Sequence, residues 1–316
     1  MLTTSTDELE KTALVPLDKL FPPNGVGSVK QGKVVGVEAD KKEVVLADGE
    51  RVAYDALVLG TGSIWPEEFN FPEDPDRIPD HLAHWRGQIK DAKSVTIVGG
   101  GAVGVEFAGE IKEFYPKTKV TIVHGQEALL NSTYPTKFRK AFESRLKARG
   151  VEIVYNDYIE NIPSGPITSV TTKKGKTIET DLVIPAFGAK PNTSFLPADF
   201  LNQANYVKVR PTLQTAAHDD IFAAGDIIDW AEQKQAAKNA GHAAVVAKNV
   251  KAVLEGRKPT AVYKGSYEII LVTVGKTGGA AYFGVLWGLV FGDWFARMLK
   301  SKDLMVPMSR GFYNYK

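Results

Sequence analysis

Three glycines with the spacing Gly99-x-Gly101-x-x-Gly104 are the residues whose type and order point most directly to chemistry. In this pattern the first glycine permits a tight turn, the second lets the backbone approach a phosphate, and the third allows a helix to pack close to a strand. Free N–H groups at the start of such a helix favour an anion. The spacing therefore predicts a site for the pyrophosphate of a dinucleotide.

The segments that flank these glycines supply the elements that would position them. Residues 95–98 are apolar or β-branched and indicate a strand, and the apolar spacing over residues 105–111 is typical of a helix. A second apolar run over residues 119–123 completes a β-α-β unit. A purely structural glycine turn is the alternative, but the order strand, turn, helix favours dinucleotide binding.

The composition of the 316-residue chain excludes several kinds of chemistry. There is no cysteine, which rules out disulfides, cysteine zinc sites, iron–sulfur clusters and a redox dithiol. A net charge of +2 gives no reason to expect a nucleic-acid partner. The five histidines show neither HxxxH nor HExxH spacing, so we expect no metal site.

Location is predicted from the ends of the chain and from its longest apolar region. The N-terminal residues form no secretory leader, and Leu2 stands where myristoylation needs glycine. Residues 280–299 are apolar, but several glycines and Asp293 interrupt them, which argues against a membrane span. We expect a cytoplasmic protein that has, at most, peripheral contact with membranes.

An internal repeat indicates two related domains. Residues 44–63 and 169–189 share one order, namely hairpin, Asp, buried apolar strand and glycine turn. The glycine fingerprint precedes the second copy, and the same offset puts that of the first copy about 27 residues before Met1. The chain is therefore expected to begin inside its first nucleotide-binding domain, without the loop that would hold the phosphates of the first cofactor.

Five motifs in order carry a resemblance that covers roughly the whole chain. They are LVLGTGS at 57–63, GGGAVGVEFAGE at 99–110, LVIPAFGAKPN at 182–192, IFAAGDIIDW at 221–230 and MLKSKDLMVP at 298–307. Together they resemble the FAD-dependent pyridine nucleotide oxidoreductases, in particular the apoptosis-inducing-factor-like branch with its ferroptosis-suppressor flavoproteins, which reduce quinones with NAD(P)H.

The resemblance implies a fold and its boundaries. The fold class is α/β, with two interleaved Rossmann-type domains for FAD and NAD(P), the first of them incomplete, and a small C-terminal α+β domain. The implied boundaries are 1–85 for the partial FAD-binding domain, 86–192 for the NAD(P)H-binding domain, 193–258 for the continued FAD-binding domain and 259–316 for the C-terminal domain.

The resemblance also implies roles for single residues. Glu106 matches a glutamate near the nicotinamide and the flavin, and Lys300, with Asp303, matches a segment near the flavin and the quinone. Glu106 and Lys300 are therefore the candidate catalytic residues. The cofactor-binding candidates are Gly99, Gly101, Gly104, Glu106, His124, Gly188, Thr61, Gly62, Gly225 and Asp226. Among them Thr61, Gly62 and Asp226 are implied contacts of FAD.

His124 departs from the pattern that would select NADH. It ends the second strand of the predicted NAD(P)H-binding domain, where an acid would hydrogen-bond the ribose 2′-OH. The preference between NADH and NADPH is therefore open, and a protonated His would suit a 2′-phosphate.

Each candidate also has a plainer explanation. A carboxylate such as Glu106 is favoured in the first turn of a helix by the helix dipole. Asp226 could cap the helix that follows it, and Lys300 could be a surface lysine. The aromatic segment over residues 282–300 could be core, or an apolar access path for a quinone that touches a membrane surface.

These observations favour an NAD(P)H:quinone-type oxidoreductase with FAD as its cofactor. With no cysteine, the electrons would pass directly from nicotinamide to flavin and on to the acceptor. The alternative is a non-catalytic NAD(P)H-binding protein, an incomplete flavoprotein that cannot retain FAD. Completion of the FAD site by a partner chain is a third hypothesis, which no sequence feature supports.

Overall fold

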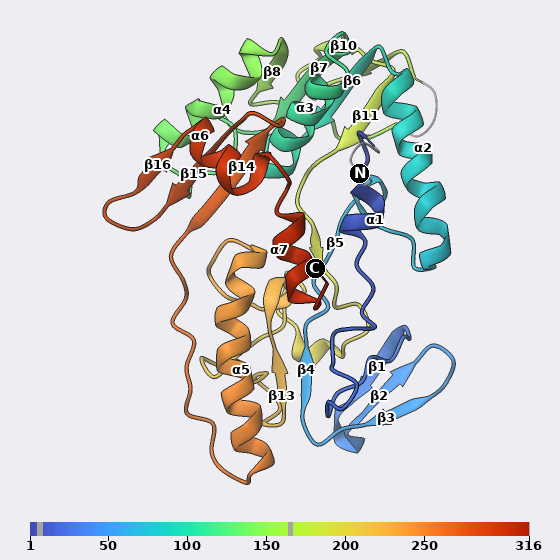
Figure 1. Cartoon of the computed structure of the whole chain (residues 1–316), viewed down its shortest axis with the longest axis vertical. Helices are drawn as coiled ribbons and strands as arrows, with labels where there is room; N and C mark the ends of the chain where they lie inside the picture. Colours follow the sequence, from blue (N-terminus) through green and yellow to red (C-terminus); the bar gives the residue numbers. More distant parts are fainter. Residues whose placement is uncertain (5–8, 164–166, 316) are drawn as a thin grey trace. The chain divides into compact units, whose positions relative to one another are not determined.

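A computed structural model describes residues 1–4, 9–163 and 167–315 of the chain, which divides into two units (Figure 1). Unit 1 comprises Met1–Val29, Pro66–Gly188 and Glu268–Lys316. Unit 2 comprises Lys30–Trp65 and Ala189–Tyr267. Each unit is therefore assembled from segments that are distant in the sequence.

The centre of unit 1 is a four-stranded parallel sheet. Its order is β11 (Leu182–Pro185), β6 (Ser94–Val98), β7 (Lys119–His124) and β8 (Val151–Tyr155). Helix α3 (Ala102–Phe114) joins β6 to β7, and α4 (Thr136–Ala148) joins β7 to β8. The predicted β-α-β unit around the glycines is confirmed.

Alternation along these strands forms two cores. Ile97, Ile122 and Ile184 belong to the core that also contains residues of α3 and α4. Their neighbours Val98 and Val183 belong to a second core on the opposite face of the sheet, because successive strand side chains point to opposite sides. The hairpin of β9 (Ser169–Thr171) and β10 (Thr177–Glu179) supplies the cover for that second face.

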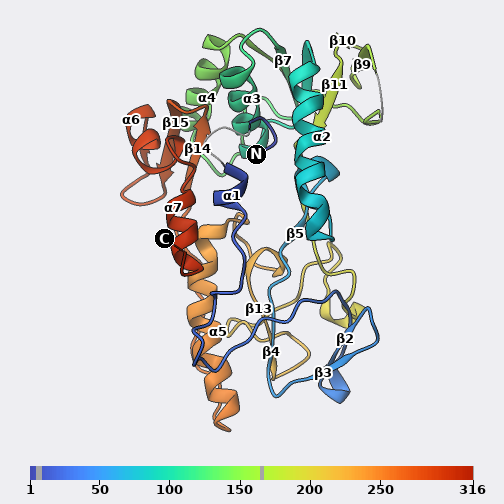
Figure 2. The same ribbon diagram turned by 45° about the vertical axis from the view of Figure 1, so that its right-hand side comes forward.

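The other elements of unit 1 come from the two ends of the chain and from the segment before β6. They are α1 (Leu9–Ala13), α2 (Ile78–Asp91), β14 (Ile269–Val274), β15 (Gly278–Phe283), β16 (Leu289–Phe291), α6 (Asp293–Ala296), a π-helical turn over Arg297–Ser301 and α7 (Val306–Phe312). Strands β14–β16 form an antiparallel sheet; β14 packs against α3 and β15 against α4. Figure 2 shows the same elements from a second direction.

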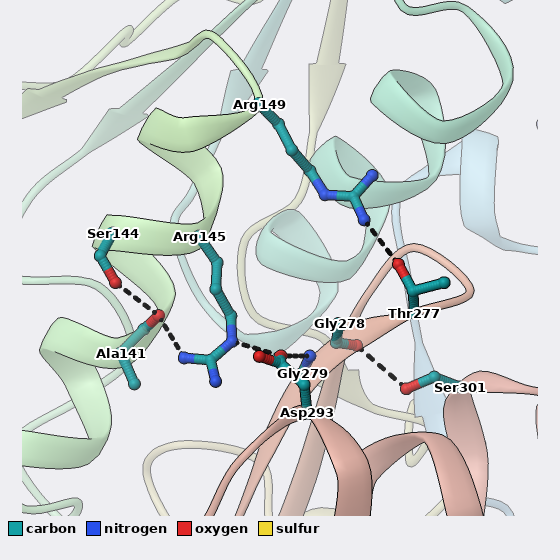
Figure 3. A network of polar contacts seen from close by, with 9 residues as sticks. All are labelled: Ala141, Ser144, Arg145, Arg149, Thr277, Gly278, Gly279, Asp293 and Ser301. Atoms are coloured by element: carbon teal, nitrogen blue, oxygen red, sulfur yellow. Dashed lines mark hydrogen bonds and ion pairs between the residues drawn. The ribbon is translucent and has the colours of Figure 1, made fainter.

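A polar network fixes the C-terminal sheet to α4 (Figure 3). Asp293 accepts hydrogen bonds from Arg145 Nε at 2.6 Å and from the backbone N–H of Gly279 at 2.8 Å. Arg149 donates to Thr277 Oγ1 at 3.3 Å, and Ser301 Oγ donates to the carbonyl oxygen of Gly278 at 3.0 Å. The last of these bonds anchors the residue next to Lys300.

The Asp293→Ala variant tests this network. Burial alone would raise the pKa of Asp293, but the hydrogen bonds from Arg145 and Gly279 outweigh it and lower that pKa. The carboxylate therefore stabilises the fold above its unfolded pKa, and this stabilisation is lost as pH falls through the folded value. We expect thermal unfolding at pH 7 to show a loss of about 1–2 kcal/mol, and a smaller loss at pH 3. An equal loss at both pH values would contradict this account.

Unit 2 contains three small sheets and one long helix. Strands β1 (Val34–Glu38), β2 (Glu43–Leu46) and β3 (Arg51–Ala53) form an antiparallel sheet, β4 (Leu57–Leu59) pairs in parallel with β13 (Ile221–Ala223), and β5 (Ser63–Ile64) pairs with β12 (Lys190–Pro191). Helix α5 (Asn239–Leu254) adds Val246 to a core formed with Phe200, Leu213 and Phe222. Alternating apolar residues over 33–38, 43–46 and 51–53 predict short strands, and β1, β2 and β3 confirm them.

Two predicted segments differ from the structure. The Ala-rich pattern of residues 233–255 predicts one long helix, but α5 begins only at Asn239; before it, Lys234 donates to the carbonyl oxygens of Ile228 and Trp230. The aromatic segment over 282–300 is not one amphipathic element, since it spans the end of β15, β16, α6 and most of the π-helical turn. Among the described residues, no helix is both long and apolar enough to cross a membrane.

Candidate functional site

The glycine loop of unit 1 has the geometry that its spacing predicts. Gly99 adopts a φ of 113°, which favours glycine. A Cβ on Gly104 would lie 2.0 Å from the carbonyl oxygen of Gly99, so only glycine allows this approach of α3 to the loop. A Cβ on Gly101 would meet no atom within 4 Å, and no side chain caps α3 there. The loop thus leaves open space beside the N–H groups that begin α3.

The loop after β7 holds the glycine loop from one side. His124 Nδ1 accepts a hydrogen bond from the N–H of Gly100 at 3.1 Å, and its Nε2 lies 3.0 Å from the carbonyl oxygen of Ala128. Arg139 donates to that same oxygen at 2.8 Å, and the N–H of Leu130 donates to the carbonyl oxygen of Gly100 at 2.8 Å. Both ring nitrogens of His124 are therefore engaged inside unit 1.

This arrangement gives His124 a defined protonation state. An Nδ1 that accepts from Gly100 carries no proton, so Nε2–H is the donor to Ala128. Burial lowers the pKa of the ring below its ordinary value. The structure places His124 as a neutral group that orients Gly100. Its predicted contact with the ribose of NAD(P)H stays a prediction.

A pH dependence follows from this. Protonation of His124 puts an N–H opposite the N–H of Gly100, which removes their hydrogen bond. The stabilisation of the fold by neutral His124 is therefore present above the unfolded pKa of about 6.5 and is lost as pH falls through the folded pKa. We expect unfolding free energy and NAD(P)H affinity both to fall between pH 7.5 and 5.5. In His124→Asn both slopes should flatten.

The control for this prediction is His242 of unit 2. Burial also lowers the pKa of His242, and its Nδ1 accepts from the N–H of Gly225 at 3.0 Å. His242→Asn should therefore flatten the pH dependence of stability but not that of NAD(P)H affinity. An unchanged affinity slope in His124→Asn would rule out the role of His124.

The two candidate catalytic residues meet in unit 1. Lys300 Nζ donates to Glu106 Oε1 at 2.6 Å, although the two residues are 194 positions apart. Thr273 of β14 donates to the same oxygen through its N–H at 2.9 Å and its Oγ1 at 3.2 Å. The side chains of Glu106 and Lys300 are 27% and 25% exposed. The pair is therefore held in place and still reachable from outside.

This pair lines a cavity of about 800 Å³ in unit 1. The wall is mainly apolar and includes Phe69, Phe71 and Phe107. Glu110 also lines the cavity, and burial raises its pKa. A large apolar cavity with a few polar groups is typical of a small-molecule site.

The candidates assigned to FAD gather at one edge of unit 2. Strands β4 and β13 are parallel, so the residues after them, Thr61 and Gly62 on one side and Gly225 and Asp226 on the other, meet at the same edge. Ser63 Oγ donates to Asp226 Oδ2 at 2.7 Å, which fixes the carboxylate there. Gly62 and Gly225 both have positive φ, with values of 67° and 78°.

These residues fit one part of FAD better than another. The edge of β4 and β13 offers open backbone at Gly62 and a fixed carboxylate at Asp226, which suit the ribityl end. Among the described residues of unit 2, no glycine loop of the kind that usually binds phosphates leads directly from a strand into an α-helix. Asp226 is the middle residue of a 3₁₀ turn over Gly225–Ile227 and does not cap a long helix.

The sequence did not single out several residues that complete these sites. Thr273 lies in a strand that is rich in β-branched residues, and it belongs to none of the sequence motifs. In unit 2, Glu232 lies 2.9 Å from His242 Nε2 and accepts a hydrogen bond from the Tyr263 hydroxyl at 2.9 Å. These three residues are separated in the sequence, so no local pattern predicts that they meet. Gly188, by contrast, was singled out; it follows β11 and has open space where a Cβ would lie.

Among the described residues, no cluster of three His, Asp or Glu side chains could hold a metal ion.

Comparison with known proteins places this geometry in a family. The model of the pyridine nucleotide-disulphide oxidoreductases matches residues 11–244. The chain belongs to this family. Its members use FAD and a nicotinamide dinucleotide, and the chain has an FAD-dependent oxidoreductase, FVFD30 of Flammulina velutipes, as a relative with 47% identity over 314 residues, which is 98% of both proteins.

Other relatives agree with this membership. Human ferroptosis suppressor protein 1 is 30% identical over 291 residues, which covers 89% of this chain and 77% of the relative. Among solved structures, an NAD-dependent persulfide reductase from A. fulgidus superposes with a TM-score of 0.64 at 19% identity, over 81% of this chain and 49% of that one. That likeness concerns the fold alone. With no cysteine, this member of the family has no dithiol for electrons to pass through.

Proposed function

We propose that this FAD-dependent pyridine nucleotide oxidoreductase passes electrons from NAD(P)H to a quinone-type acceptor. The observation that supports this most is the Glu106–Lys300 pair in an apolar cavity of the unit that contains the glycine loop. Such a cavity suits a flat apolar ring with polar oxygens. The balanced reaction consumes NAD(P)H, a proton and the quinone, and gives NAD(P)⁺ and the hydroquinone.

In this proposed reaction, the glycine loop, the FAD-site residues and the Glu106–Lys300 pair have separate roles. Gly99, Gly101 and Gly104 bind the pyrophosphate of NAD(P)H at the start of α3, where the loop leaves space. Asp226 and the backbone at Gly62 hold FAD, which when bound accepts a hydride and delivers electrons to the acceptor. Glu106 and Thr273 keep Lys300 in place, so that its ammonium group can donate a hydrogen bond to a quinone oxygen.

A non-catalytic NAD(P)H-binding protein is the second candidate function. The observation that favours it is that unit 2 lacks, among its described residues, a glycine loop that runs directly into an α-helix. The fit of FAD then depends on the edge of β4 and β13 alone. On this basis we expect weak FAD retention, and added FAD should be needed for full occupancy.

A visible absorption spectrum separates the two candidates. It is recorded on the purified protein, then after addition of excess FAD and gel filtration, and then after addition of NADH. A flavin band that bleaches with NADH and returns with a water-soluble quinone supports the oxidoreductase. Protein that binds NADH but stays colourless after loading would rule it out in favour of the non-catalytic protein.

A further inference from the structure

We infer that the β15–β16 hairpin and α6 form a surface that docks on an anionic lipid bilayer. This inference rests on the proposed function, and it adds that an apolar quinone would reach the protein from the lipid bilayer. We call this surface the tryptophan face. Its exposed members are Leu286, Trp287, Leu289, Phe291, Trp294 and Met298.

The exposure of this face is unusual for apolar side chains. Trp287 is 102% exposed, Trp294 is 76% exposed and Leu286 is 73% exposed. Trp294 of α6 and Met298 of the π-helical turn are four residues apart, a spacing that brings side chains to the same side of a helical segment. Several exposed apolar side chains on one hairpin and the helical segment that follows it mark an interaction site, whereas single exposed apolar residues are ordinary.

The hairpin is built to present these residues. Leu286 and Trp287 both adopt positive φ, with values of 48° and 66°, a conformation that non-glycine residues seldom take. Below the tip, Phe295 stacks on Phe291 and makes an edge contact with Phe283, with centroid separations of 4.6 and 5.7 Å. A packed aromatic base therefore supports an exposed tip. In Figure 1 the β15–β16 loop extends from the edge of unit 1.

The charges around this face favour an anionic bilayer over a second protein. Arg297 and Lys302 are exposed on the segment that continues from α6. Of the two acids on this segment, Asp293 is already paired with Arg145 at 2.6 Å, and the exposed Asp303 beside Lys302 leaves Arg297, Lys302 and Asp303 with a net charge of +1. Two tryptophans with basic neighbours match the interface between lipid head groups and acyl chains. The same segment continues through Lys300 to Leu304, which both line the cavity, so docking would bring the cavity close to the lipid.

The test is co-sedimentation with vesicles of phosphatidylcholine, with and without phosphatidylserine. It needs neither FAD nor NAD(P)H. We expect binding to anionic vesicles with a blue shift of tryptophan fluorescence. In Trp287→Ser the partition coefficient should fall about ten-fold, the effect of withdrawing one large apolar side chain. In R297Q/K302Q it should fall about five-fold per charge, and only with phosphatidylserine present.

Leu254→Ser is the matched control, because Leu254 is 58% exposed on α5 and lies outside the tryptophan face. It should bind vesicles as the unaltered protein does. Thermal unfolding checks that Trp287→Ser is folded, as its full exposure predicts. Absence of vesicle binding by the unaltered protein, or equal loss in L254S and W287S, would overturn the inference.

Two further outcomes separate this inference from its rivals. If W287S only converts a dimer to a monomer in light scattering, while vesicle binding is absent, the tryptophan face is an interface between two copies and the membrane inference is wrong. If the protein binds vesicles but does not oxidise NADH with a water-soluble quinone, the proposed function fails and the docking surface stands.

Discussion

Gly101→Ala is expected to leave the unfolding free energy unchanged and to weaken NAD(P)H binding by about ten- to a hundred-fold. The reason is that the space beside Gly101 is open in the free loop but would be filled when a dinucleotide is bound. A Cβ at Gly101 meets no protein atom within 4 Å, and the residue has an ordinary φ of −72°. A bound pyrophosphate would fill this space, since the second glycine of the fingerprint is where the backbone approaches it. Equilibrium fluorescence titration with NADH measures the change.

Two other glycines provide the controls for this variant. Gly104→Ala puts a Cβ 2.0 Å from a backbone oxygen of Gly99, so it should cost about 3 kcal/mol of stability. Gly87→Ala, within α2 and equally free of neighbours, should add up to about 1 kcal/mol and leave NADH binding as it is. If Gly101→Ala binds NADH like the unaltered protein, the pyrophosphate does not lie on this loop.

The sequence predicted the local units of this fold well. The strand, glycine turn and helix around Gly99 are determined by neighbours within about thirty residues. The apolar run over residues 151–155 likewise predicts a strand by itself, and this strand is β8. Local patterns also located the hairpins at residues 43–53 and 169–179. Such elements follow from periodicity and turn residues, which are properties of one short segment.

Residues far apart in the sequence were predicted only as separate candidates. No local pattern says that Lys300 reaches Glu106, since the contact needs β14 to pack on α3 and the π-helical turn to be anchored through Ser301. Thr273 was missed for the same reason. His124 was chosen for its place at the end of a strand, but its hydrogen bond to Gly100 depends on how two loops meet.

The aromatic segment shows a different limit of sequence interpretation. From the sequence, residues 282–300 as a whole could be either part of the core or an apolar access path at the surface. The structure divides them: Tyr282 packs in the main core and Phe295 in the aromatic base, while Trp287 and Trp294 face outward. A helical or strand period could not separate them, because the segment changes from strand to turn to helix within twenty residues.

Lys300→Met is expected to lower kcat for quinone reduction by about a hundred-fold while KM for NAD(P)H stays within about three-fold. Methionine keeps the length and apolar packing of the side chain and removes the ammonium group. If Lys300 donates to the acceptor, its loss acts on the transition state of electron delivery and not on binding of the nicotinamide cofactor. Lys300→Arg, which keeps the charge, should retain part of the activity. Steady-state kinetics of the FAD-loaded enzyme with a water-soluble quinone measures these values.

A structural role for the ion pair predicts a different pattern. Glu106 and Lys300 are each about a quarter exposed, so their pairing contributes at most about 1 kcal/mol to stability. Lys147 offers a matched control, because its Nζ also lies 2.6 Å from a carboxylate oxygen, that of Glu143, on the surface of α4. K147M should change stability by a similar amount and leave kcat unaltered. If K300M behaves like K147M, Lys300 serves only to hold the C-terminal segment against α3, and the acceptor must be reduced without its hydrogen bond.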